Sequence, residues 1–149
     1  MRLPVIVAVA VATLSSVAAA QSPTPATPAR LEAPSSPAAD SALRSMRTVL
    51  RQLAGAEEAY YTTHGTYTTD VAALGLLDME GFRSGRTAWV AVSFAGGRGW
   101  SAEARHVRFK GKSCVNYVGD AANILGGVPK TMGDRTPAEQ MGAPTCDAI

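Results

Sequence analysis

From Asp40 onwards the apolar residues recur at the spacing of an amphipathic helix. Polar and charged residues occupy the other faces, and the apolar stripe is formed by Leu43, Met46, Leu50, Leu53 and Tyr60. Intervals of three, four or seven residues bring such side chains to one face of a helix. We expect a helix from Asp40 to His64, with a cap at Asp40-Ser41 and an end at Gly65, where glycine can adopt a left-handed conformation.

The pattern is irregular between Gly65 and residue 86. Thr68 or Thr69 can cap a short helix from Asp70 to Leu74, which Gly75 would end. The segment 75–85 contains several large apolar residues but no helical or alternating period. We therefore expect it to be a loop that packs on the core.

From Thr87 onwards the apolar period changes to two, which is typical of strands. We expect strands at 87–94, 100–109 and 114–118, joined by glycine-containing turns. The inward face of the first strand should carry Ala88, Val90, Val92 and Phe94. An isolated small sheet would leave apolar surface in water, so the helix should cover one face. The sequence thus predicts an α+β fold, with a long N-terminal amphipathic helix on a three- to four-stranded antiparallel meander.

Residues 119–149 are rich in Gly, Pro, Asp and Thr, and we expect Ile124, Leu125 and Val128 to be buried. The chain has two cysteines, Cys114 and Cys146. An even count in an exported protein favours a disulfide, which would pin this C-terminal loop to the third strand. Such a bond would stabilise the fold by about 3–4 kcal/mol. A metal site or two free thiols are the alternatives.

The first 39 residues differ in composition from the rest of the chain. Residues 1–20 have a basic start, an apolar run and an Ala-Ala-Ala end, which predict a signal peptide cleaved before Gln21. An uncleaved membrane anchor is the alternative. Residues 21–39 are rich in Pro, Ala and Thr and predict a disordered linker. We expect one domain at 40–149 in a periplasmic or secreted protein, with no stable membrane insertion after cleavage.

Candidate chemistry is sparse. No Ser-His-Asp or Cys-His arrangement, phosphate-binding loop, EF-hand or zinc spacing is apparent, so we expect no catalytic residue, no metal and no cofactor. His64 should sit at the helix end, facing the helix dipole. His106 should be solvated, and Glu57 and Glu58 should be surface charges.

A basic strip is the one candidate binding site in the sequence. It contains Arg105, Arg108, Lys110 and Lys112, and the last three would project to one side of an extended chain. Such a strip could contact DNA phosphates, sulfated glycans or an acidic partner. The alternative is a solvated hairpin that protects an edge strand from aggregation.

The segment 56–76, AEEAYYTTHGTYTTDVAALGL, resembles the globular part of type IV pilins and type II secretion pseudopilins. Tyrosines at a helix end, a glycine, an aromatic-Thr pair and a following Asp and Leu are similar to that family. The resemblance implies a non-enzymatic packing and assembly module, with Cys114 and Cys146 bounding a C-terminal loop. Any small α+β domain with an N-terminal helix is the alternative.

One departure from the family concerns the N-terminus. Pilins begin with a short basic leader and a hydrophobic helix with an acidic fifth residue, whereas residues 5–20 contain no Glu or Asp. We therefore expect that the chain does not polymerise as a standard pilin subunit does. We expect a structural or interaction module that docks onto a pilus, secretion or surface assembly through loops 75–85 and 119–146. The alternative is a free secreted protein that binds DNA or another polyanion through the basic strip.

Overall fold

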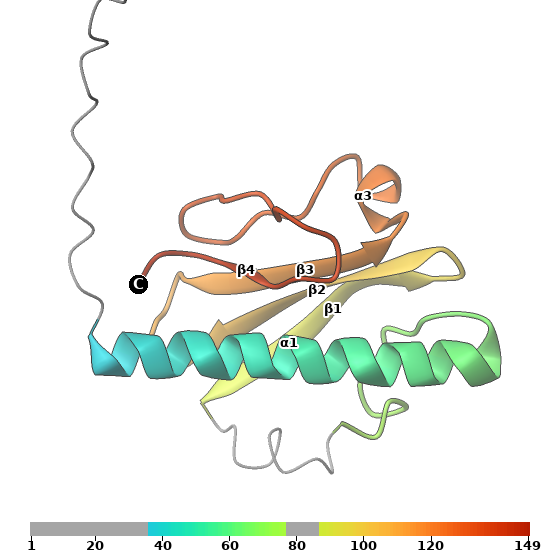
Figure 1. Cartoon of the computed structure of the whole chain (residues 1–149), viewed down its shortest axis with the longest axis horizontal. Helices are drawn as coiled ribbons and strands as arrows, with labels where there is room; N and C mark the ends of the chain where they lie inside the picture. Colours follow the sequence, from blue (N-terminus) through green and yellow to red (C-terminus); the bar gives the residue numbers. More distant parts are fainter. Residues whose placement is uncertain (1–35, 77–86) are drawn as a thin grey trace, which may run out of the picture. The chain divides into compact units, whose positions relative to one another are not determined.

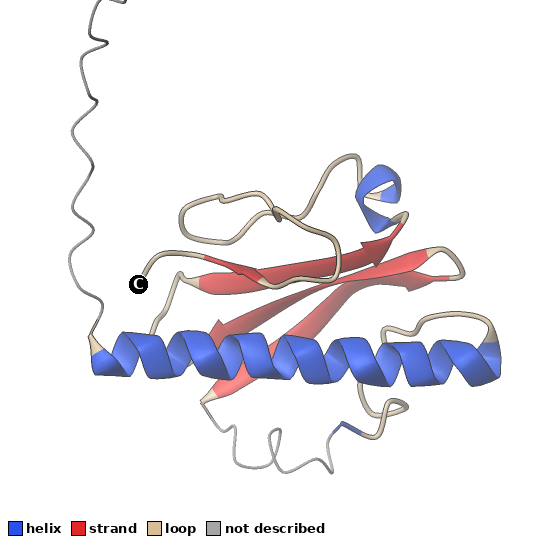
Figure 2. Ribbon diagram, viewed as in Figure 1, coloured by secondary structure: helices blue, strands red, loops and turns tan. Residues whose placement is uncertain are grey.

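The structure is a computed structural model that describes residues 36–76 and 87–149. One long helix lies against one face of a four-stranded antiparallel sheet of order β1-β2-β3-β4 (Figures 1 and 2). The elements are α1 (Pro37–His64), β1 (Ala88–Gly96), β2 (Gly99–His106), β3 (Ser113–Gly119), α3 (Ala121–Ile124) and β4 (Thr145–Cys146). The expected α+β fold is confirmed. The expected signal peptide, the linker up to residue 35 and the loop residues 77–85 lie outside the described residues.

Helix α1 begins earlier than the sequence pattern predicts. The Ser36 side chain accepts a hydrogen bond from Ala39 N at 3.2 Å, and Pro37 occupies the first turn. Proline is favoured there because its fixed φ suits a helix and its missing N–H needs no partner. The expected cap at Asp40-Ser41 is therefore wrong, and residues 37–39 belong to the helix. Gly65 ends the helix as expected, with φ 68°.

A series of turns follows α1, instead of the expected short helix from Asp70 to Leu74. The Thr68 side chain accepts a hydrogen bond from Asp70 N at 3.0 Å, and the Asp70 side chain accepts hydrogen bonds from Ala72 N at 2.9 Å and Ala73 N at 3.3 Å. Leu76, at the end of these turns, is completely buried. This residue packs on the core, as we expected of the loop's apolar residues.

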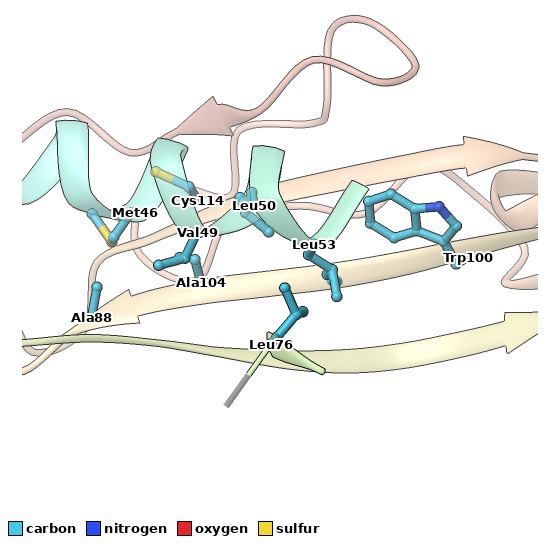
Figure 3. Close-up of a cluster of buried hydrophobic side chains, with 10 residues drawn as sticks. Met46, Val49, Leu50, Leu53, Leu76, Ala88, Trp100, Ala104 and Cys114 are labelled. Atoms are coloured by element: carbon cyan, nitrogen blue, oxygen red, sulfur yellow. The ribbon is translucent and has the colours of Figure 1, made fainter. Parts of the chain in front are cut away.

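The core lies between α1 and the sheet. Met46, Val49, Leu50 and Leu53 of α1 form one cluster with the helix-facing residues of the strands, which include Trp100, Ala102, Ala104 and Cys114 (Figure 3). The small alanines of β2 leave room for the larger helix side chains. Interdigitation of large and small residues gives the dense packing of protein interiors. The predicted helix stripe is thus the buried face of α1.

A β-bulge in β1 changes which side chains face the helix. Val92 pairs with Ala102 and Phe94 pairs with Ser101, so Ser93 is an extra residue in β1. Because side chains alternate between faces, one extra residue reverses the alternation that follows it. Ala95, opposite Trp100, therefore joins the core in place of Phe94. The expectation that Phe94 continues the inward face is wrong.

Strand β2 ends at His106, three residues before the expected end. Turns follow, in which Phe109 N donates to His106 O at 3.1 Å and Lys112 N donates to Phe109 O at 3.2 Å. Gly111 has φ 78°, a conformation that favours glycine. Residues 107–112 are therefore a turn, so the expected extension of the strand through Val107 and Phe109 is wrong.

The C-terminal tail is held by a disulfide and by strand pairing. Cys114 and Cys146 form the expected bond, and the same residues pair where β4 joins β3. Ile124 and Leu125 are 41% and 46% exposed, so the expectation that they are buried is wrong. Helix α3 has only four residues and buries Ala121 instead. Val128 is partly buried.

Asp147 fixes the tail beside the start of β3. Its buried carboxylate accepts hydrogen bonds from Ser113 N at 2.8 Å, Gly133 N at 3.0 Å and Asp134 N at 2.6 Å. Burial acts to raise the pKa of Asp147, but hydrogen bonds from the Thr131 side chain and these N–H groups outweigh it and lower the pKa. The tail is thus anchored by a buried charge as well as by the disulfide.

Candidate functional site

A hollow of about 350 Å³ opens where β1, β2, the 107–112 turn and the tail meet. Its apolar lining comes from Trp89, Val107, Phe109 and Met132. Its polar lining comes from Arg105, His106, Lys110 and Lys112. Three of the four residues of the basic strip therefore line one concave surface, next to aromatic and aliphatic side chains.

A small hairpin in the tail positions Met132 at this hollow. Lys130 and Pro137 form a β-bridge, and Thr131 N donates to Thr136 O at 2.9 Å. Met132 N donates to the Ser113 side chain at 2.7 Å, which places the hairpin against the start of β3. The backbone of Met132 is thus fixed, while its side chain is 37% exposed.

Two cations of the basic strip already have acidic partners. Arg105 forms an ion pair with Glu103 at 2.7 Å, and its guanidinium carbon lies 5.1 Å from the centre of the Trp89 ring. Lys112 forms an ion pair with Asp134, also at 2.7 Å. These carboxylates reduce the positive charge that Arg105 and Lys112 can offer to a ligand.

The other two cations of the strip are exposed. Neither Arg108 nor Lys110 forms an ion pair with a carboxylate in the described part of the chain. Lys110 lines the hollow, whereas Arg108 does not. The 107–112 segment is a turn, so the expected projection of Arg108, Lys110 and Lys112 to one side of an extended chain is wrong.

His106 is buried, with 8% of its surface exposed, which corrects the expectation that it is solvated. Its Nδ1 accepts a hydrogen bond from Arg108 N at 3.2 Å, and its ring lies 5.7 Å from that of Phe109. Burial and, secondarily, the Arg108 charge lower the pKa of His106. The ring is therefore neutral at pH 7, with its proton on Nε2.

Residues of the segment 56–76 form a second cluster of polar contacts, at the end of α1. Glu57 is completely buried, and its Oε2 accepts a hydrogen bond from Thr68 N at 3.1 Å. Its Oε1 is buried without a hydrogen-bond partner. Burial raises the pKa of Glu57; the Thr68 hydrogen bond opposes this effect, and the Glu58 charge adds to it. The expectation that Glu57 is a surface charge is wrong.

Tyr67 completes this cluster from the loop side. Its hydroxyl donates to Glu58 at 3.0 Å, and its ring stacks on Tyr61 at 4.6 Å. Burial and the bond to Glu58 raise the pKa of Tyr67 to about 12. These contacts, together with that of Glu57, hold the chain after Gly65 against the last turns of α1.

His64 has the structural position that we expected for it. Its ring stacks on Tyr60 at 3.9 Å, and Nδ1 lies 3.0 Å from the carbonyl oxygen of Tyr60 in the last turn of α1. The sequence therefore placed this histidine correctly, because a helix end is a local feature.

The disulfide-closed tail presents exposed apolar residues. Ile124 and Leu125 lie at the end of α3, and Met141, which is 55% exposed, lies in the loop before β4. Exposed apolar side chains in a connecting segment are candidates for contact with a partner. These side chains and the hollow are candidate binding surfaces in the part of the chain that the structure describes.

Two lining residues of the hollow, Trp89 and Met132, were not predicted to be functional. The sequence did indicate that Trp89 points away from the core, because it alternates with the core-facing residues of its strand. Nothing in the sequence indicated a position for Met132 at this surface, because only the folding of the tail brings it to β2.

Within 36–76 and 87–149, no group of three or more His, Cys, Asp or Glu residues could hold a metal ion. No helix in these ranges has the length and apolar character needed to cross a membrane. Comparison with models of protein families and with curated proteins finds no match to this chain.

Proposed function

We propose that this chain is an exported, non-enzymatic module of pilin-like architecture that docks onto a type IV pilus, secretion or surface assembly. The observation that carries the proposal is the order and packing of the elements. A long helix covers an antiparallel meander, a tyrosine-bearing loop folds back on the helix end, and a disulfide closes the tail. Disulfides are typical of proteins in oxidising compartments, which supports export.

The tail is the docking surface in this proposal. Its backbone is anchored by the disulfide and by Asp147, while Ile124, Leu125 and Met141 remain exposed. A rigid frame that presents apolar side chains lowers the entropy cost of binding a partner. Docking was expected through loops 75–85 and 119–146, and this proposal uses the second loop. In the first loop Leu76 is completely buried, and residues 77–85 lie outside the described residues.

Chemical cross-linking in the native host tests the proposal. The full chain carries a C-terminal affinity tag, and mass spectrometry identifies its cross-linked partners. We expect components of a pilus or secretion assembly, in a fraction that resists washing at high salt. Recovery of the uncross-linked chain alone, from cells in which such an assembly is expressed, would contradict the proposal.

The second candidate function is binding of DNA or another polyanion through the basic strip. The exposed side chains of Arg108 and Lys110 support it, and the pairing of Arg105 and Lys112 with carboxylates weakens it. Counterion release makes such binding steeply dependent on salt. Titration with heparin and single-stranded DNA at two salt concentrations tests it, and a lack of salt-sensitive affinity would exclude it.

A further inference from the structure

We propose that the hollow between β1, β2 and the tail binds a small amphiphilic anion, with one carboxylate on an aliphatic body. Three properties of the hollow define this ligand. They are an apolar wall, a single cationic side chain without a carboxylate partner among the described residues, and a limited volume. This inference concerns a different surface from that of Ile124, Leu125 and Met141 and does not depend on the proposed docking function.

The wall is apolar and open to water. Trp89 is 46% exposed, Val107 is 49% exposed and Met132 is 37% exposed, although they come from three separate segments of the chain. Convergence of large apolar side chains on a concave surface is a common property of ligand sites. An aliphatic body in the hollow would remove these side chains from water, which is favourable at roughly 25 cal/mol per Å² of apolar surface.

The charge of the lining selects one anionic group. Glu103 pairs with Arg105 and Asp134 pairs with Lys112, while the neutral ring of His106 adds no positive charge. Lys110 is therefore the only lining cation without a carboxylate partner among the described residues. A polyanion would need several free cations for its successive charges. A single carboxylate is matched by Lys110 alone.

The volume limits the size of the ligand. The hollow of about 350 Å³ lies near the lower end of the range of ligand pockets, about 300–1,000 Å³, so it suits a small ligand. Octanoate, with eight carbons and one carboxylate, lies within this limit. Octan-1-ol and octylammonium have the same aliphatic body with a neutral and a positive head group, so they isolate the contribution of charge.

Tryptophan fluorescence gives a direct readout of binding to the full chain. The chain has two tryptophans: Trp100 is completely buried in the core, whereas Trp89 lines the hollow. We expect a saturable fluorescence change with octanoate and binding at least fivefold weaker with octanol and octylammonium. The change should disappear in Trp89→Phe, while isothermal calorimetry on that variant should still detect octanoate.

Two matched pairs of variants locate the site. Lys110→Ala should weaken octanoate binding about fivefold or more and leave octanol binding unchanged, while Lys130→Ala, an exposed lysine outside the hollow, should change neither. Met132→Ala should weaken both ligands, and Met141→Ala should weaken neither. Absence of saturable octanoate binding, equal affinity for octanoate and octanol, or equal effects within either pair would overturn the proposal.

Discussion

The charge of Asp147 is closely tied to the fold. It accepts hydrogen bonds from backbone N–H groups of β3 and of the tail hairpin, and these bonds favour the ionised carboxylate. Its pKa in the folded chain lies below the usual value of 3.8. Its contribution to stability is therefore fully present above pH 3.8 and is lost as the pH falls through the folded pKa.

Replacement of this carboxylate should be costly at neutral pH. Asp147→Asn places an amide NH₂ group among N–H donors, which leaves buried donors without acceptors. We expect a loss of about 3 kcal/mol in the free energy of unfolding at pH 7, measured by urea denaturation. Glu139→Gln, at an exposed carboxylate, is the control and should change stability by less than about 0.5 kcal/mol. Equal stability of the two variants would show that Asp147 does not anchor the tail.

Glu57 has the opposite dependence on pH. Burial raises its pKa in the folded chain above the usual 4.5, so its contribution to stability is fully present below pH 4.5 and declines as the pH rises through the folded pKa. Glu57→Gln removes the buried charge and keeps an oxygen for Thr68 N. We expect the variant to be more stable than the wild type at pH 7, by on the order of 1 kcal/mol, with the difference vanishing near pH 4.

Thermal unfolding at several pH values measures this effect. Glu58→Gln provides the neighbouring control, because Glu58 is exposed and its bond from the Tyr67 hydroxyl can be kept by glutamine. That variant should gain less than Glu57→Gln at pH 7, because it relieves only the repulsion between the two carboxylates and leaves the buried charge of Glu57 in place. A Glu57→Gln protein less stable than the wild type at pH 7 would mean that the ionised form of Glu57 has a partner that stabilises it.

At the scale of elements, the contact between α1 and the sheet carries the fold. Leu50 is completely buried in this contact, whereas Leu125, at the end of α3, is 46% exposed. Leu50→Ala leaves a cavity and should cost about 2–5 kcal/mol, while Leu125→Ala should cost less than about 0.5 kcal/mol. Urea denaturation of both variants checks this. Similar losses of stability in the two variants would contradict a core between α1 and the sheet.

The disulfide stabilises the pairing of β4 with β3. Replacement of Cys114 and Cys146 by alanine should lower the free energy of unfolding by about 3–4 kcal/mol. Without the bond, the unfolded chain has a higher conformational entropy. Hydrogen exchange should show faster exchange at Asp147 N, which donates to Ser113 O at 3.0 Å. A reductant should destabilise the wild type and leave the double variant unchanged. Insensitivity of both to reductant would contradict the bond's role.

Elements with a strong local period could be predicted from the sequence. The apolar stripe of α1 is set by side chains that must face one core, so the buried face of this helix was found. The end of α1 was also found, since Gly65 acts within one turn. The start was missed because Ser36 and Pro37 lie in a proline-rich segment that predicted a linker.

Features that depend on distant contacts could not be predicted. The bulge at Ser93 has no signal in β1 itself, and it turns Phe94 away from the core. Glu57 is buried because the loop after α1 folds back and places Thr68 beside it. His106 is buried because the turn after β2 folds over it. The hollow was only partly found: its cations were visible in the sequence, but their pairing with Glu103 and Asp134 was not.

At the scale of the whole molecule, the described residues include two candidate binding surfaces. The hollow has a charge and a volume that suit the proposed small anion. The tail presents apolar side chains on a frame fixed by the disulfide, and its proposed occupant is a protein of a pilus, secretion or surface assembly. The two surfaces can be tested separately, because Lys110 and Met132 line the hollow while Leu125 and Met141 do not.

Site-specific photo-cross-linking in the native host tests the proposed docking function most directly. A photoreactive amino acid replaces Leu125 or Met141 in the tail, or Ala91 at an exposed position of β1 as the control. We predict cross-links from positions 125 and 141 to a component of a pilus, secretion or surface assembly, and none to that component from position 91. If the tail positions gave no such cross-link, or no more than position 91, the proposed docking through the tail would be contradicted.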